Sequence, residues 1–155
     1  MGRIEVNKMK STTTTTYEKD FYGWTVSTAQ LLRDGKMSEV DFENIIEEIE
    51  ALGRSEKHQL INRLALVISH LLKWQYQATL RSHSWIYTIR EQRIQAQIHL
   101  SDNPSLKSKL DDILKVAYDV AISKAAKDTS LDKKDFPSEC PYTFEQIMDD
   151  GFYPE

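Results

Sequence analysis

Residues 54–77 constrain the fold most, because their apolar side chains recur at the three- and four-residue spacing of a helix face. The stripe consists of Leu60, Leu64, Val67, Ile68, Leu71 and Trp74, and Ala65 and Leu72 widen it. A helix with so broad an apolar face contacts neighbours on more than one side, as the central helix of a bundle does. The 155 residues include only 5 Gly and 4 Pro, too few for the turns of an all-β fold. The sequence therefore predicts an all-α fold around this helix.

Two helices are predicted before the central one. Asp20 caps the first, which ends at Asp34-Gly35. Ser38 and Asp41 resemble a capping box for the second, an acidic helix over residues 39–52. Its apolar stripe is Phe42, Ile45, Ile46, Ile49 and Leu52. We expect Gly53 to break or kink the chain before the central helix, because glycine costs roughly 1 kcal/mol relative to alanine inside a helix.

Three helices are predicted after the central one. Ser82 or Ser84 caps a helix that runs to about residue 99, and Asn103 caps the next. Thr143 and Gln146 form a capping box for a short last helix. We expect a single-domain helical bundle of four to five main helices plus a short C-terminal helix over residues 17–155. Residues 1–16 are expected to form a disordered N-terminal tail.

Charge alternates along the chain, although the net charge is only −4. Residues 17–53 carry three basic and nine acidic groups, a net charge of −6, whereas residues 54–100 carry seven basic and two acidic groups, a net charge of +5. Either the basic middle faces a polyanion, or it packs between acidic neighbours of the same fold. The sequence pI of about 5.6 disfavours nucleic acid as the partner, since nucleic-acid-binding domains are usually basic.

The stretch SWIYTIREQR, residues 84–93, interleaves aromatic side chains with arginines. At about 100° per residue, Arg93 falls inside an apolar stripe, and a second apolar face lies on the opposite side of the helix. The stripe is formed by Trp85, Ile89, Ala96 and Leu100, and the second face by Tyr87, Ile94 and Ile98. Such a helix is expected to be sandwiched between neighbours, and an arginine within the stripe must either snorkel or be paired.

The acidic helix supplies carboxylates for such a pair. We expect Arg93, with Arg90 as a second candidate, to form an ion pair with Glu47 or Glu50, because a guanidinium can hold a carboxylate with two hydrogen bonds. These four residues and His83 make up a candidate charged cluster, which is where an active-site pocket would form if the chain is an enzyme.

Catalytic and metal-binding patterns are otherwise missing from the sequence. The chain has no Glu-x-x-His motif of a carboxylate-bridged metal site and no pair of histidines four residues apart. Cys140 has no neighbouring base that would lower the pKa of its thiol. His70 borders the apolar stripe and is interpreted as a packed, hydrogen-bonded side chain. We therefore predict no catalytic residue, no metal ion and no cofactor.

Four segments in order resemble the bacterial family called domain of unknown function 29: EEIEALGRSE, LLKWQYQ, SWIYTIREQR and CPYTFEQ. The resemblance covers about residues 17–154, and the combination is specific although each segment alone is weak. It implies a small all-helical bundle from bacteria. The family has no defined activity or catalytic residues, so the resemblance implies none for this chain.

Three function classes remain. The first is a protein-interaction or regulatory module, including a homo-oligomer, which we favour because it requires no chemistry that the sequence lacks. The second is a small helical enzyme that uses the charged cluster, and the third is a nucleic-acid-associated factor. A single cysteine and the absence of any run of 18 apolar residues favour a cytoplasmic protein with no membrane partner.

Overall fold

The computed structural model describes residues 16–155, and its regular elements are all helical there, which confirms the predicted all-α class. Apart from Thr16, the tail predicted for residues 1–16 lies outside the described residues. The chain divides into two compact units, the first ending at Gly53 and the second running from Arg54 to Glu155. The single domain predicted over residues 17–155 stays a prediction.

The first unit contains α2, Phe21–Arg33, a short 3₁₀ helix, Met37–Glu39, and the first part of α3. Asp20 caps α2 as predicted, because its Oδ1 accepts a hydrogen bond from the backbone nitrogen of Gly23 at 2.9 Å. Gly35 ends the turn after α2 with a φ of 69°, a left-handed conformation that glycine adopts without strain. Trp24 is buried, and the ring of Tyr17 packs edge-on against it at 4.9 Å between centroids.

Helix α3, Phe42–Tyr76, is one helix of 35 residues, so the break predicted at Gly53 is wrong. A glycine costs only about 1 kcal/mol in a helix interior, and the apolar residues on both sides of Gly53 favour continuation. The predicted cap, Ser38, is also wrong, because Ser38 lies in the 3₁₀ helix. Asp41 caps α3 instead, since its Oδ1 accepts from the backbone nitrogen of Asn44 at 3.3 Å.

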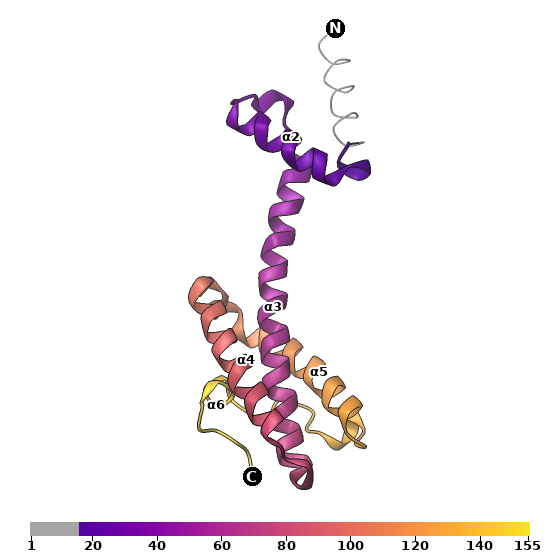
Figure 1. The fold of residues 1–155 in the computed structure, drawn as a ribbon, viewed down its shortest axis with the longest axis vertical. Coiled ribbons are helices and arrows are strands. Elements are labelled where there is room, and N and C mark those ends of the chain that lie inside the picture. The colour runs from indigo at the N-terminus through magenta and orange to yellow at the C-terminus, as the bar shows by residue number, and fades with distance from the viewer. Residues whose placement is uncertain (1–15) are drawn as a thin grey trace. The chain divides into compact units, whose positions relative to one another are not determined.

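The second unit contains the rest of α3 together with α4, His83–Asp102, α5, Leu110–Asp128, and α6, Phe144–Met148. Figure 1 shows α4 and α5 on either side of this part of α3, with α6 beside α4. The core consists of fully buried side chains of these helices, among them Leu60, Leu64, Ile68 and Leu71 of α3, Ile89 and Ala96 of α4, Ile113 and Ala117 of α5, and Ile147 of α6. The predicted central role of residues 54–77 follows from this arrangement.

The helix starts in this unit agree with the sequence in part. Thr143 and Gln146 form the predicted capping box of α6, in which each side chain bonds the other residue's backbone nitrogen. Ser82 precedes α4, but its hydroxyl pairs with that of Ser84 instead of capping the helix. After Asn103 the chain first forms a 3₁₀ helix, Pro104–Lys109, and becomes α-helical only at Leu110.

Helix α4 is buried on one face only within the described residues. Ile89, Arg93, Ala96 and Leu100 are buried, as their shared stripe predicts. The second apolar face, formed by Tyr87, Ile94 and Ile98, is exposed. The prediction that α4 is sandwiched is therefore wrong for the part of the chain that the structure describes, because periodicity shows where apolar side chains lie but not whether a neighbour covers them.

Candidate functional site

Arg93 of α4 is only 2% exposed and binds the C-terminal segment. Its Nε donates to the carbonyl oxygen of Ile147 at 2.7 Å, and its Nη2 donates to the carbonyl oxygens of Phe152 at 2.9 Å and Gln146 at 3.4 Å. The guanidinium carbon also lies 5.5 Å from the centre of the Tyr153 ring. Burial lowers the pKa of the guanidinium. Arg93 thus holds α6 and the residues after it against α4.

The sequence left open whether Arg93 reaches solvent or is paired, and in the structure its side chain is buried and bonded to backbone carbonyls. Its pairing with Glu47 or Glu50 stays a prediction. The last carbonyls of a helix have no donor within that helix. That of Ile147, at the end of the short helix α6, therefore needs one from elsewhere, whereas that of Gln146 also accepts from the backbone nitrogen of Asp149 at 3.3 Å. A guanidinium offers several N–H donors in a fixed geometry and can satisfy more than one carbonyl at a time.

His83 and Arg90, the other members of the charged cluster on α4, do not share the buried position of Arg93. His83 and Arg90 are exposed on α4, where the ring of His83 lies 6.5 Å from that of Tyr87. The three basic side chains of α4 therefore do not converge. Glu47 and Glu50 belong to the first unit, where both are exposed on α3 and both take part in interactions.

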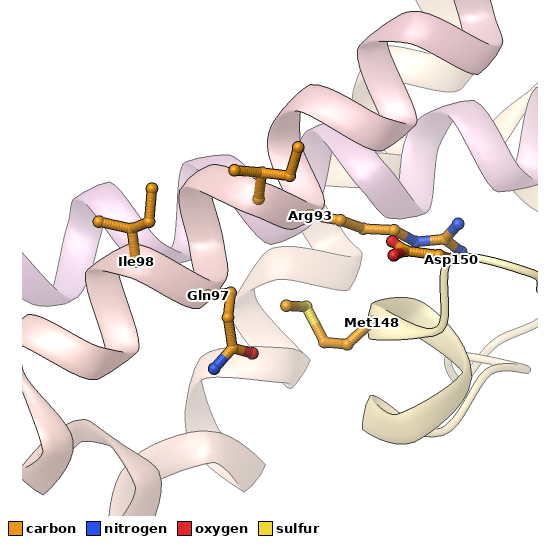
Figure 2. A pocket seen from close by; sticks show the side chains of 6 residues that line it. Arg93, Gln97, Ile98, Met148 and Asp150 are labelled. Carbon is orange, nitrogen blue, oxygen red and sulfur yellow. The ribbon is translucent and has the colours of Figure 1, made fainter.

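An open pocket of about 300 Å³ lies beside Arg93, between α4 and the end of α6 (Figure 2). Ile94, Gln97 and Ile98 of α4 line one side, and Met148 and Asp150 line the other. Arg93 contributes its side chain, but its Nε and Nη2 are already bonded to carbonyls. The pocket therefore combines the apolar side chains of Ile94, Ile98 and Met148 with the polar groups of Gln97 and Asp150. The Nη1 of Arg93 is buried and has no hydrogen-bond partner within the described residues.

A second open pocket, of about 460 Å³, lies between α5 and the loop that contains Cys140. Burial raises the pKa of the Cys140 thiol, whose Sγ donates to the carbonyl oxygen of Tyr142 at 3.4 Å. Burial also raises the pKa of Tyr118 to about 12, and its hydroxyl donates to the carbonyl oxygen of Pro137 at 2.6 Å. A thiol with a raised pKa is a poor nucleophile at neutral pH, so this pocket lacks an activated group.

Two further polar contacts join the helices of the second unit, and the sequence did not indicate either one. His99 Nε2 lies 2.8 Å from the carbonyl oxygen of Glu56 and 3.3 Å from its carboxylate. Lys73 is buried, and its Nζ lies 3.1 Å from the Asp128 carboxylate. His70 is packed as interpreted, with Nδ1 2.9 Å from the carbonyl oxygen of Leu66. The contacts of His99 and Lys73 join α3 to α4 and to α5, whereas that of His70 lies within one turn of α3.

In residues 16–155 no group of three or more His, Cys, Asp or Glu side chains is arranged to hold a metal ion. No helix of the described chain combines the length and the apolar character that crossing a bilayer requires.

The first part of α3 carries the most extensive exposed apolar stripe on a single helix. Phe42, Ile46, Ile49 and Leu52 are 47%, 54%, 62% and 68% exposed. At about 100° per residue they lie within about 120° of one another around the helix. Glu43, Glu47 and Glu50 are exposed along one edge of the stripe. We call these four apolar side chains and three glutamates the acidic seam. The sequence indicated the stripe, but its exposure is a finding of the structure.

The family of the chain follows from one comparison. Residues 16–153 match the family described as Domain of unknown function DUF29, which is nearly the whole chain. The chain therefore belongs to that family. No curated protein and no solved structure matches it.

Proposed function

We propose that this member of the DUF29 family is a protein-interaction module that binds a helical segment of another protein through the acidic seam. The observation that carries the proposal is the exposure of four large apolar side chains on one face of α3. Single exposed apolar residues are common on soluble proteins, whereas contiguous ones mark interaction surfaces. Covering side chains of this size stabilises an assembly by about 1.5–3 kcal/mol for each one that becomes fully buried.

The spacing of the seam supports a helical partner. Phe42, Ile46 and Ile49 follow one another at intervals of four and three residues. Contacts at positions i, i+4 and i+7 are how two helices pack along a shared seam. An extended peptide would instead seek a free strand edge, and the described residues contain no strand.

The charge of the first unit supports a protein rather than a polyanion. Residues 17–53 carry a net charge of −6. Phosphate backbones and anionic lipid surfaces attract basic surfaces, so they are repelled by this one. The alternative of a small enzyme has less support, because Arg93 is committed to backbone carbonyls while His83 and Arg90 are exposed.

We also propose that the module acts in the bacterial cytoplasm. The single cysteine of the chain supports a reducing compartment, since Cys140 has no second cysteine with which to form a disulfide within the chain.

The experiment is site-specific photo-crosslinking in the native host with the full-length chain. A photoreactive amino acid replaces Ile49 in one strain and the exposed Lys107 in a control strain. We expect a protein adduct from position 49 that is absent from position 107 and that disappears when Ile46 and Leu52 are changed to Gln. Adducts of equal yield at both positions, or adducts with nucleic acid or lipid alone, would refute the proposed function.

A further inference from the structure

We infer that the occupant of the acidic seam is an amphipathic helix with lysine or arginine side chains along the edges of its apolar face. The inference rests on the proposed function and adds the chemistry of the partner. It follows from the groups that surround the four apolar side chains, which are acidic on both edges. Glu43, Glu47 and Glu50 are exposed along one edge, and Asp41 and Glu48 are half-buried near the other.

The part of α3 that forms the acidic seam contains no lysine or arginine. Between Phe42 and Gly53, α3 contains four glutamates and no Lys or Arg, and the first basic residue is Arg54. Glu47, Glu50 and Arg54 already take part in interactions within the chain. Complementary charge along an interface disfavours wrong partners and speeds association, so a partner with basic edges is preferred to a neutral or acidic one.

The shape of the seam fits about three turns of a partner helix. The eleven residues from Phe42 to Leu52 span ten steps of about 1.5 Å each, a rise of about 15 Å. Gly53 follows directly, and a Cβ atom added there would meet nothing within 4 Å. Nothing packed against α3 in this chain therefore requires a glycine, although glycine is unfavourable in a helix interior. A partner helix that crosses α3 at this position would explain the glycine, because a residue without a side chain lets the two helix backbones approach closely.

A second copy of the same seam is a poorer occupant. Two copies of the seam would bring two acidic segments together, since residues 17–53 of each chain carry a net charge of −6. Like charges at a helix interface destabilise the pairing. An anionic membrane surface is excluded on the same electrostatic ground. The helix that fits is therefore apolar on one face and basic at both edges.

The test measures binding of designed peptides to the full-length chain by fluorescence anisotropy. The first peptide, of about 21 residues, has Leu and Ile at the a and d positions of three heptads and Lys at the flanking positions. The second has Glu in place of each Lys, and the third has the composition of the first in shuffled order. We expect the lysine-flanked peptide to bind at least about tenfold more tightly than either of the others. Raising the salt from about 50 mM to about 500 mM should weaken its binding.

Two double variants separate binding at the seam from non-specific attraction. Ile46→Gln/Ile49→Gln removes apolar contacts from the seam, and Leu80→Gln/Val116→Gln makes comparable changes at exposed apolar positions of the second unit that line neither pocket. The first should weaken binding of the lysine-flanked peptide at least about tenfold, and the second less than about twofold.

Three results would overturn the inference: no binding of the lysine-flanked peptide, equal affinity for the lysine- and glutamate-flanked peptides, or equal loss in both double variants. A fourth such result can come from sedimentation of the chain alone, which measures its oligomeric state. A dimer that Ile46→Gln/Ile49→Gln dissociates would make a second copy the occupant. That result would contradict the inference about the partner but agree with the proposed interaction function. The proposed function itself is refuted if photo-crosslinking gives no adduct that depends on the seam.

Discussion

Replacing Arg93 with alanine should destabilise the second unit strongly, because the carbonyl groups of Ile147 and Phe152 would lose the donor that Arg93 supplies and that of Gln146 would keep only its bond from the Asp149 backbone nitrogen. Two of the hydrogen bonds are short, at 2.7 Å to Ile147 and 2.9 Å to Phe152, and the third, at 3.4 Å to Gln146, is weak. Hydrogen bonds to charged groups contribute about 1.5–3 kcal/mol each. Gln146 and Phe152 are half-buried, so water can compensate in part. We expect Arg93→Ala to lower the free energy of unfolding by about 3–5 kcal/mol.

The assay is urea unfolding of the full-length chain, followed by circular dichroism at 222 nm. Arg93→Lys keeps a positive charge but loses the planar arrangement of donors, so we expect an intermediate loss. Arg90→Ala removes an exposed arginine of the same helix and should change the free energy by less than about 0.5 kcal/mol. Hydrogen exchange of residues 144–153 should accelerate in Arg93→Ala, since the segment that Arg93 holds would open locally.

The reasoning is refuted if Arg93→Ala costs less than about 1 kcal/mol, the range of an exposed ion pair. Unchanged hydrogen exchange in residues 144–153 would refute it as well, because the loss would then come from elsewhere in the fold.

Three further predictions concern single positions. Burial lowers the pKa of His70, so the folded state binds its proton less readily than the unfolded state does. The free energy of unfolding should therefore fall as the pH drops from about 7.5 to about 5.5. Urea unfolding at each pH should show a smaller fall for His70→Gln. Burial raises the pKa of Cys140, so iodoacetamide should modify it more slowly at about pH 7.5 than it modifies a cysteine in a short peptide, as followed by mass spectrometry; faster modification would contradict the assignment. Gly53→Ala should raise the free energy of unfolding by about 0.5–1 kcal/mol, because the added methyl group meets nothing within 4 Å and alanine favours the helix; a loss of stability would show that the glycine is needed by the fold.

Periodicity predicted the helices and placed Arg93 within an apolar stripe, because both depend on which side of a helix is apolar. Whether the Arg93 side chain is buried was left open. It did not predict the partner of Arg93. The three carbonyl groups lie 53 to 59 residues further along the chain, and a backbone carbonyl has no residue type by which a sequence could reveal it. A carboxylate was expected instead because only side-chain charges are visible in the sequence.

The same limit applies to the candidate site. The apolar stripe of residues 42–52 was visible, but a stripe that packs inside its own chain and one that stays exposed have the same spacing. The density of glutamates between Phe42 and Gly53 was the available signal, since a helix edged by charge on both sides resembles one half of a helix pair. Gly53 was predicted to break or kink the chain because glycine is unfavourable inside a helix. The break is wrong, since α3 continues through Gly53.

One measurement tests most directly whether the acidic seam is a binding surface rather than part of the core. The free energy of unfolding and the affinity for the lysine-flanked peptide are measured on the same Ile46→Gln/Ile49→Gln chain, with Leu64→Ala as the reference for a fully buried position. We predict a change in stability of less than about 1 kcal/mol, against about 3–5 kcal/mol for Leu64→Ala, and at least a tenfold loss of affinity. A stability loss as large as that of Leu64→Ala, with unchanged peptide affinity, would contradict the proposed function.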